Sequence, residues 1–522
     1  MNTELERVNP AGVGLSGNAI LDYIEKLQAS GSEPHGIMIA RHGKVCAEGW
    51  WKPYSPGLIH GLQSLTKSYT ATAVGILVSA GRLSLDEKLV DILPEFIPDN
   101  ISANLKALNI HHLLTMGAGN NSMQDRTKPT WLNDFFASEF PYVPGSRFYY
   151  SGVVTSVLGA VIRKKTSLGL MDFLKTRLFN KIGIDAGHLK WLEHPDGLEY
   201  GGGGLFATTE DNLRLGQLYL NGGVWHGEQI LSEKWVKAAT SKQIGNEDEK
   251  PADNRVGYGY KIWMCQPSGV YRFDGAHGQF VIVVPDLDMV ISLNQMADGP
   301  LAQKTLDITW QYLTKARGSD SGDLKVASLM PCLSLPRTEC AAIPQQKLFT
   351  AGRTYRFDRN DVELFPGAYN MLSYKAPRGI EQITFSEGRG EIVAEISSGN
   401  HSFCVHVSLD GVDRLSVLHV ADDLPEMVYA YGVWMNSHTL KITLRYLETC
   451  YTVSYIIKRH LQGIELTAFR WQLIKVGPEE PTRTPLFDGR PTEAERCVEA
   501  TRTRKRLRTN RRPGGSTSTE DS

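Results

Sequence analysis

The segment 64–77, SLTKSYTATAVGIL, places a serine three residues before a lysine at the start of an apolar stretch with helical character. Residues three apart share a face of an α-helix, so we expect the Ser64 hydroxyl and the Lys67 amine to be neighbours. A lysine can take the proton of a hydroxyl when burial or a nearby cation disfavours its own charge. Such a pair would be an activated nucleophile. In the alternative interpretation, Ser64 only caps the helix and Lys67 is a solvated residue of its first turn.

Two later segments carry groups that would complete acyl-transfer chemistry. In YYSG, Tyr150 is a candidate base, because a tyrosine near two cations ionises more readily. The neighbouring Tyr149 is an alternative, although the spacing from PGSRF favours Tyr150. The segment 275–279, GAHGQ, precedes a strand-like run, and its glycines would let a substrate lie against the strand edge. A backbone N–H there and that of Ser64 would form an oxyanion hole.

Three segments resemble, in the same order, the three motifs of the serine β-lactamase-related hydrolases: SLTK, FYYSG and GAHGQF…VVPDLDMVISL. This family includes class C β-lactamases, D,D-carboxypeptidases, D-aminopeptidases, esterases, 6-aminohexanoate-oligomer hydrolases and the peptidase that acts on linearised microcystin. The resemblance covers roughly residues 15–315 and extends to intervening stretches such as GRLSLDEKLVDILPEF. It implies an α+β fold: a β-lactamase-like antiparallel sheet with flanking helices and a helical subdomain.

The resemblance also implies a role for each matched residue. Ser64 corresponds to the nucleophile that is acylated, and Lys67 to its partner base. Tyr150 corresponds to the tyrosine that passes a proton to the leaving group and then activates water. The segment 276–278 corresponds to the third motif, which binds the substrate carboxylate or acyl edge. The chemistry requires no metal and no organic cofactor.

Two positions depart from the family pattern. The second motif usually ends in asparagine, but here it ends in Gly152, so the amide that would hold Lys67 and the substrate is missing. The third motif is Lys-Thr-Gly, or His-x-Gly in relatives, whereas the matching segment 276–278 has neither lysine nor threonine. His277, Gly278 and Gln279 are the candidate substrate-binding or oxyanion residues here, together with Gly152. His277 either supplies the missing donor or only marks the turn, and an alternative register shifts it by one position. Both departures argue against efficient penicillin hydrolysis and fit esterases or peptidases with looser pockets.

The elements expected to position these residues alternate along the chain. Helical periodicity occurs at 17–30, and a hairpin is centred on residues 42–43. A helix is expected after Gly152 and another after a cap at Thr208 or Thr209, before two strands joined near residue 285. This order fits antiparallel strands with helices on their faces. We assign residues 1–317 to a catalytic domain.

The remainder of the chain changes in character. Residues 318–348 are polar and broken by prolines, which predicts a linker. Residues 349–477 contain alternating strand-like runs that predict an antiparallel barrel-like domain, similar to the lipocalin-like domains of some of these hydrolases. Its many aromatic residues either overhang the catalytic cleft or form the core of the barrel itself. The composition of residues 478–522 predicts a disordered basic tail. In the alternative interpretation, this tail binds RNA or an acidic surface.

The overall composition argues against several classes of binding partner and cellular location. With a formal net charge of −1, the 522-residue chain has no overall field that would attract nucleic acid or an acidic membrane. Seven scattered cysteines without a C-x-x-C motif suit a reducing compartment. The first residues lack the basic segment followed by an apolar segment that is typical of a signal peptide. No run reaches the ~18 apolar residues that a membrane helix needs, so we expect a cytoplasmic protein. His111 and His112 are possible metal ligands, but no third metal-binding side chain occurs at a spacing known from metal sites. We therefore expect no bound metal.

Three hypotheses follow from the sequence. The first is a serine hydrolase that cleaves amide bonds of small or unusual linear peptides, including D- or non-ribosomal ones, through an acyl-enzyme on Ser64. The second is a carboxylesterase with the same site. The third is a non-catalytic ligand-binding relative in which Gly152 marks lost activity.

Overall fold

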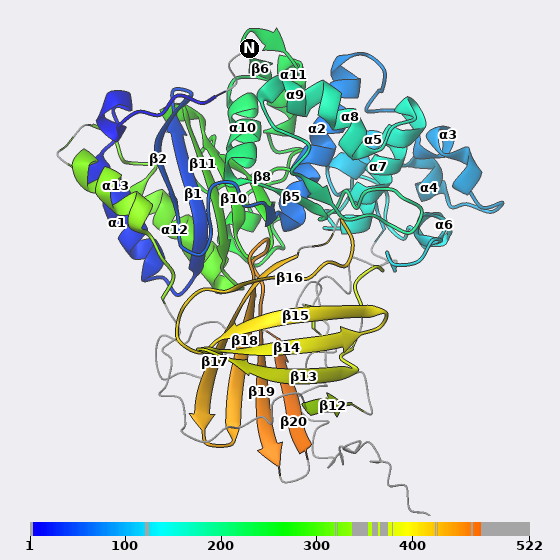
Figure 1. Ribbon diagram of the computed structural model, residues 1–522. Helices are drawn as coiled ribbons and strands as arrows, with labels where there is room; N and C mark the ends of the chain where they lie inside the picture. Colours follow the sequence, from blue (N-terminus) through cyan, green and yellow to red (C-terminus); the bar gives the residue numbers. More distant parts are fainter. Residues whose placement is uncertain are drawn as a thin grey trace, which may run out of the picture.

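The computed structural model describes residues 4–120 and 125–336, except 319 and 321. In the second half of the chain it describes residues 353–357, 364–365, 374–377, 379–422, 424, 426–460 and 463–470. The mixed helical and stranded first half lies against a second half built of strands (Figure 1). The expected basic tail lies outside the described residues.

An antiparallel sheet of six strands organises the first half, with strand order β2-β1-β11-β10-β9-β8. Its strands are β1 (Glu33–Arg41), β2 (Lys44–Trp50), β8 (Trp263–Met264), β9 (Tyr271–Gly275), β10 (Gln279–Val284) and β11 (Met289–Met296). In β1 seven consecutive residues are buried, because helices cover both faces of the sheet. The hairpin predicted around residues 42–43 joins β1 to β2, and the later hairpin joins β10 to β11.

Helices occupy both faces of this sheet (Figure 1). One face carries α1 (Gly17–Gln28), α12 (Pro300–Tyr312) and α13 (Asp323–Leu329), and the other carries α10 (Thr209–Leu220). Beyond α10 lies a helical region that contains the long helices α2 (Thr66–Ser79) and α7 (Gly152–Thr166). The shorter helices are α3 (Leu89–Ile92), α4 (Ala103–Ala107), α5 (Ile110–Leu114), α6 (Trp131–Ala137), α8 (Leu170–Leu174), α9 (Asn180–Ile182) and α11 (Glu233–Ala239). The expected α+β architecture with a helical subdomain is confirmed.

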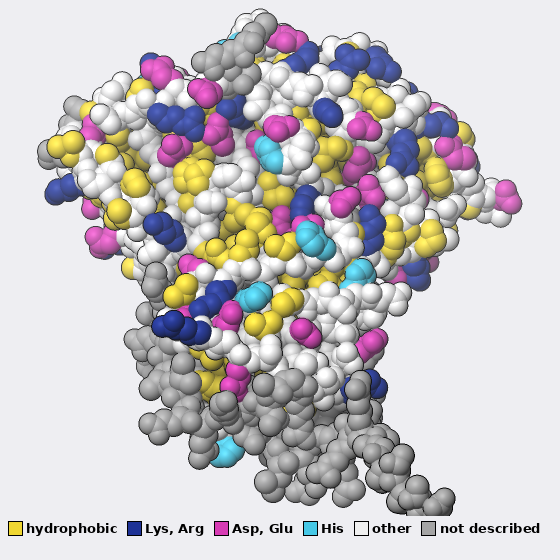
Figure 2. Space-filling view, in the orientation of Figure 1, with side chains coloured by type: hydrophobic (Ala, Val, Ile, Leu, Met, Phe, Trp, Pro, Cys, Tyr) yellow, Lys and Arg dark blue, Asp and Glu magenta, His cyan; other side chains and the backbone are white. Residues whose placement is uncertain are grey.

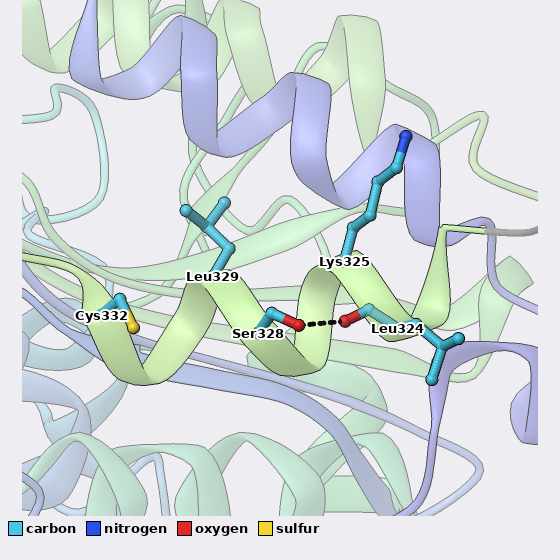
Figure 3. Close-up of a pocket in the computed structure, with 5 residues that line it drawn as sticks. All are labelled: Leu324, Lys325, Ser328, Leu329 and Cys332. Atoms are coloured by element: carbon cyan, nitrogen blue, oxygen red, sulfur yellow. Dashed lines mark hydrogen bonds between the residues drawn. The ribbon is translucent and has the colours of Figure 1, made fainter.

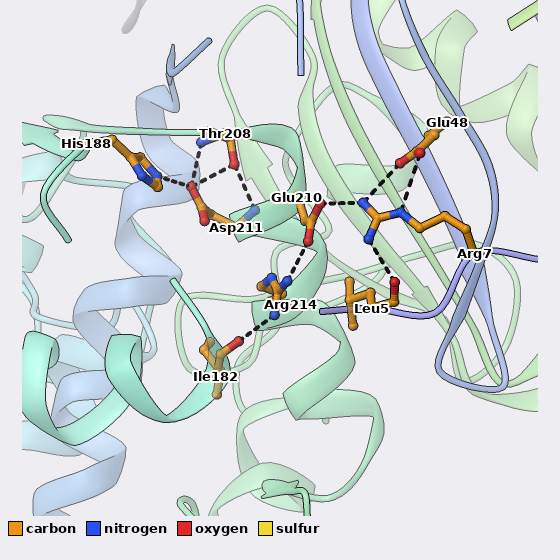
Figure 4. Close-up of polar contacts among 9 residues, drawn as sticks. All are labelled: Leu5, Arg7, Glu48, Ile182, His188, Thr208, Glu210, Asp211 and Arg214. Carbon is orange, nitrogen blue, oxygen red and sulfur yellow. Dashed lines mark hydrogen bonds and ion pairs between the residues drawn. The ribbon is translucent and has the colours of Figure 1, made fainter. Parts of the chain in front are cut away.

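Polar contacts anchor the start of α10, the helix that joins the sheet to the helical region (Figure 4). The Thr208 side chain accepts a hydrogen bond from the Asp211 N–H and caps the helix, as one of the two predicted caps. Next to it, Glu210 pairs with Arg7 at 2.6 Å and with Arg214 at 2.5 Å. These contacts tie the N-terminal segment and the helix to one another.

The second half is a sheet of nine strands with order β12-β13-β14-β15-β17-β18-β19-β20, and β16 pairs with β17. Its strands are β12 (Arg353–Arg356), β13 (Gln382–Gly388), β14 (Glu391–Ser398), β15 (His401–Ser408), β16 (Leu415–Val417), β17 (Met427–Asn436), β18 (Thr439–Tyr446), β19 (Thr452–His460) and β20 (Gly463–Arg470). All pairs are antiparallel except β15 with β17. Buried and less buried residues alternate along β17, so one face of the curved sheet encloses an apolar core. This is the barrel-like β architecture that the sequence predicts.

Part of the stretch predicted as a linker is packed structure. Within 318–348, α13 is followed by a 3-10 helix, Met330–Cys332, that contacts β2. Val326, Met330 and Leu333 are buried in the core beneath α1 and β2. Their spacing of four and three residues forms one apolar helical stripe, which the prolines and serines around it obscure in the sequence. The linker boundary is therefore corrected to a position after residue 335.

An ion pair between the two halves lies where β18 approaches β1. Arg445 donates to both carboxylate oxygens of Glu33, and His35 contacts the same carboxylate at 3.1 Å. Burial alone would raise the pKa of Glu33, but Arg445 and His35 hold that pKa well below its usual range. Charges of both signs intermix over the visible surface (Figure 2), consistent with the near-zero net charge.

The remaining strands of the described residues are only two or three residues long. The short strands are β3 (His60–Gly61), β4 (Lys190–Trp191), β5 (Leu205–Ala207), β6 (Val224–Trp225) and β7 (Glu228–Gln229). Across the described residues, no helix combines the length and the apolar character needed to cross a membrane.

We predict that Arg445→Met lowers the free energy of unfolding by about 3 kcal/mol, because it leaves the Glu33 carboxylate buried without its main partner. Chemical denaturation monitored by fluorescence measures this change. The double variant Glu33→Gln with Arg445→Met should recover most of the loss. Arg7→Met, which breaks a more exposed pair with Glu48 and Glu210, serves as control and should cost less than about 1 kcal/mol. Equal losses for the two arginine variants would contradict a special role for the Arg445 pair.

Candidate active site

Ser64 and Lys67 meet at the start of α2, as their spacing predicts. Ser64 lies in a short 3-10 helix, Gln63–Leu65, that leads directly into α2, and the Lys67 Nζ atom lies 2.9 Å from the Ser64 Oγ atom. Gln63 adopts a left-handed backbone conformation with φ of 52°, which turns the chain into the helix at this point. The Ser64 side chain therefore stands beside the positive end of a helix whose first ten residues are buried.

The environment of Lys67 disfavours its charge. The residue is 2 % exposed, and burial, together with the positive charge of Arg126, lowers the pKa of the amine to about 7, although Asp274 acts in the opposite direction. The Nζ atom donates a second hydrogen bond, of 2.5 Å, to the Gly202 carbonyl oxygen. A fraction of Lys67 is thus neutral near pH 7 and able to accept a proton.

Tyr150 is the third group at this point. The Lys67 Nζ atom lies 4.8 Å from the centre of its ring, and Ser64 lowers the pKa of its hydroxyl, which indicates that the two hydroxyl groups are close together. The alternative residue, Tyr149, is 36 % exposed. The expectation that Tyr150 ionises readily is wrong for this structure, because burial raises its pKa well above the usual value. Tyr150 is therefore a neutral phenol that holds its proton.

Gly152 occupies the position where the family pattern has asparagine, and its surroundings explain the glycine. A Cβ atom at this position would lie 2.4 Å from the Tyr200 hydroxyl and 3.1 Å from the Arg126 Nη1 atom. Arg126 donates to the Tyr200 hydroxyl and stacks over the ring of that residue. The space above Gly152 is thus filled by Tyr200 and Arg126, and the Gly202 carbonyl holds the Lys67 amine in place of the missing amide.

The third predicted segment forms the turn between β9 and β10. His277 and Gly278 both have positive φ, as a short hairpin turn requires, and Gln279 begins β10. The His277 ring meets that of Tyr451 edge-on, with 5.7 Å between ring centres and 75° between ring planes. Its Nδ1 atom lies 3.4 Å from an Asp298 carboxylate oxygen.

Within this turn, the closest approach to the Ser64 region is made by Gly275. A Cβ atom at Gly275 would lie 2.1 Å from the Leu62 carbonyl oxygen, whereas the Gln279 side chain donates to the Gln295 carbonyl oxygen at 2.6 Å. The substrate-binding roles expected of His277, Gly278 and Gln279 stay predictions.

Sequence reasoning missed the charged residues of β9. Arg272 is fully buried and donates from Nε to the Asp274 Oδ2 atom at 2.7 Å. Asp274 raises the pKa of both Lys67 and Tyr150 and so lies within electrostatic reach of the site. The available signal was the pattern YRFDG, in which two charges two residues apart share one face of an otherwise apolar strand.

A turn of the second half reaches the same region. After β18, the chain at 447–451 contacts the backbone of the first half, where the Gly61 N–H donates to the Glu448 carbonyl at 2.8 Å. The Gln63 side chain donates to the Tyr451 hydroxyl at 3.0 Å, one residue before Ser64. By contrast, Tyr446 and Tyr455 belong to the core of the barrel-like sheet. The core interpretation is therefore confirmed for Tyr446 and Tyr455, while an overhang of aromatic residues over the catalytic cleft stays a prediction.

Other candidate features lie elsewhere. Among the described residues, no group of three or more His, Cys, Asp or Glu side chains could hold a metal ion. The glycines at 201–204 form a turn beside Lys67, as predicted. A surface pocket on α13, lined by Leu324, Lys325, Ser328, Leu329 and Cys332, shares no residue with the site (Figure 3).

Several known proteins are similar to parts of this chain. A sequence model of the family described as Beta-lactamase matches residues 22–313. The 6-aminohexanoate-dimer hydrolase of Paenarthrobacter ureafaciens is 24 % identical over 277 residues, covering 49 % of this chain and 70 % of that protein. Esterase EstB of Burkholderia gladioli is 32 % identical over 175 residues, covering 28 % of this chain and 44 % of that protein.

Solved structures include a penicillin-binding protein homolog from Caulobacter crescentus, with a TM-score of 0.48, 18 % identity and coverage of 57 % of this chain and 99 % of that one. A structure of SurE with D-Leu matches with a TM-score of 0.46 and 16 % identity, covering 84 % of this chain and 97 % of that one.

We predict that Gly152→Ala lowers the free energy of unfolding by about 1–3 kcal/mol, because the added methyl group collides with the Tyr200 hydroxyl. Thermal unfolding measures the loss. Adding Tyr200→Phe removes the hydroxyl and should recover part of the stability. Gly57→Ala is the control, since a Cβ atom there meets nothing within 4 Å. A Gly152→Ala variant as stable as the control would show that this space is not filled.

Proposed function

Because the chain belongs to the beta-lactamase family of hydrolases, we propose that it is a serine hydrolase that cleaves amide bonds of small or unusual linear peptides, including D- or non-ribosomal ones. The observation that carries this proposal is the convergence of three groups distant in the sequence. At the start of a buried helix, the Lys67 amine lies 2.9 Å from the Ser64 hydroxyl oxygen and 4.8 Å from the centre of the Tyr150 ring, and Ser64 lowers the pKa of the Tyr150 phenol. The neutral fraction of Lys67 supplies the base that a serine nucleophile needs.

The protonation states suggest an order of proton transfers. Neutral Lys67 accepts the Ser64 proton while the Ser64 oxygen attacks the substrate carbonyl. The oxyanion lies against the Ser64 N–H and a backbone N–H of the turn 275–279. Tyr150, still protonated because of its raised pKa, donates to the leaving amine or alcohol and is reprotonated by Lys67. Water then releases the acyl group by the reverse transfers, with no metal or cofactor needed.

Two features support a short substrate. The turn 447–451 is fastened beside the nucleophile through Gln63 and Tyr451, which limits the space on that side of Ser64. A relative named 6-aminohexanoate-dimer hydrolase is named for a dimer as its substrate. A carboxylesterase is the second candidate, because another relative is named an esterase. A non-catalytic role is disfavoured, since Gly202 replaces the hydrogen bond that Gly152 cannot provide.

We predict that a fluorophosphonate probe adds one phosphonyl group to the full chain and that Ser64→Ala abolishes this adduct. Intact mass spectrometry detects the adduct. Ser328→Ala, a change on the exposed surface of α13, is the control and should label like the wild type. Labelling that persists in Ser64→Ala would refute the proposed nucleophile. Parallel assays with a short peptide and a p-nitrophenyl ester then distinguish the amidase from the esterase.

We predict that activity rises with pH to half of its maximum near pH 7, because only neutral Lys67 can accept the Ser64 proton. Arg126→Met removes a cation that disfavours the protonated lysine, so it should raise the pKa of Lys67 and move this midpoint upward by about one unit. A pH–rate profile of kcat/KM measures the shift. Arg126→Lys keeps the charge and should keep the wild-type midpoint, as should Arg82→Met at an exposed site. An unchanged midpoint in Arg126→Met would contradict this role of Arg126.

A further inference from the structure

One edge of β9 faces the proposed nucleophile. Among the described residues, β8 pairs on that edge only with Tyr271 and Arg272. Strand β9 itself continues through Asp274 to Gly275. Gly275 lies against the Leu62 carbonyl, two residues before Ser64. The last residues of β9 therefore lie beside the turn that carries the Ser64 hydroxyl.

Asp274, Arg272 and Trp263 form a row of neighbouring side chains that ends beside Tyr150, and we call this row the wall. Asp274 shares a face of β9 with Arg272, whose guanidinium lies 5.5 Å from the centre of the Trp263 ring. The Trp263 ring in turn lies 5.4 Å from that of Tyr150. Although Arg272 is fully buried, 21 % of the Asp274 side chain is exposed. The exposed part of this wall is therefore the carboxylate and not the guanidinium.

The negative charge of Asp274 is not fully offset by its partner. Arg272 pairs with the Asp274 carboxylate at 2.7 Å and donates to the Asp253 backbone carbonyl at 3.0 Å, and the charges of both aspartates stabilise its positive charge. Burial raises the pKa of the Asp274 carboxyl, whereas Arg272 and Lys67 act in the opposite direction. Once both carboxylates are ionised, the single guanidinium leaves this group with a net negative charge. The cation on the other side is Arg126, which lies over Gly152 and acts on Lys67. The site thus has a negative side at β9 and a positive side at Arg126.

We propose that Asp274 is a specificity-determining residue that binds a cationic group on the leaving half of the substrate, such as the ammonium of a diamine or a lysine-like amine. The leaving half is assigned to this side because Tyr150, its proton donor in the proposed mechanism, is held by the same wall. A leaving group with a carboxylate is disfavoured by the like charge. This inference rests on the Ser64 acyl-enzyme proposed above and reverses the carboxylate preference that the third motif of the family implies.

Phosphonylation of Ser64 by matched reagents tests the preference in the full chain. Three methylphosphonothioates share one phosphonyl group and differ in the leaving thiol: thiocholine, the uncharged 3,3-dimethylbutanethiol and 3-mercaptopropionate. In each reaction the Ser64 oxygen forms a bond to phosphorus, the phosphorus–sulfur bond breaks, and the thiolate leaves and takes up the serine proton through Lys67 and Tyr150. Intact mass spectrometry at pH 8 and low salt gives the rates.

We expect the cationic reagent to react about tenfold faster than the neutral one, and the anionic reagent to react most slowly. Each rate is divided by the rate of the same reagent with hydroxide, which corrects for the different acidities of the leaving thiols, and all ratios refer to these corrected rates. In Asp274→Asn the corrected ratio of cationic to neutral rates should fall to about 1. Asp298→Asn is the matched control, because it removes another carboxylate near the turn, 3.4 Å from His277, and should keep the wild-type ratio. Each ratio is internal to one variant, so a general loss of reactivity does not affect it.

The outcomes separate this inference from the proposed function. A ratio near 1 in the wild type, or an equal ratio in Asp274→Asn, overturns the role of Asp274 while Ser64 remains the nucleophile. Failure of all three reagents to label Ser64 overturns both proposals. If Asp274→Asn does not fold, the wild-type ratio is measured again in 0.5 M NaCl. A fall in the ratio supports a charge interaction, and an unchanged ratio counts against it.

Discussion

The burial of one amine is the constraint on which the site depends. Lys67 can accept a proton only while its charge is kept out of water, and this requires that the whole first half of α2 be enclosed. The enclosing elements come from distant parts of the chain: α7, the glycine turn at 201–204 and the end of β9. The fold of the first half is therefore the means by which a lysine acquires a pKa near neutrality.

Charge around this amine is balanced from two sides. Arg126 favours the neutral lysine, while Asp274 favours the protonated one, and each residue comes from a different segment of the fold. Tyr150 is partly buried against Met116, Tyr258 and Trp263, and this desolvation raises its pKa so that it keeps its proton. One buried region thus produces opposite results for its two titratable groups: an amine that readily loses its proton and a phenol that keeps it.

Sequence patterns predicted the features that depend on local spacing. The pairing of Ser64 with Lys67 follows from helix geometry, and the Thr208 cap follows from the residue types at a helix start. The ionisation of Tyr150 was predicted wrongly, because it depends on how deeply tertiary packing buries the ring. The filling of the space above Gly152 by Tyr200 could not be predicted, because those residues meet only in the folded chain. Asp274 was missed because its importance depends on where β9 ends relative to Ser64.

The contact between Gln63 and Tyr451 joins the residue before the nucleophile to the second half of the chain. The C-terminal half is consequently in direct contact with the segment that carries the proposed nucleophile. Over evolution, exchange or drift of that half would reshape the chemistry of the first half without altering any of its own residues. Relatives that share the three motifs but carry a different C-terminal part are therefore expected to diverge in the compounds that they process.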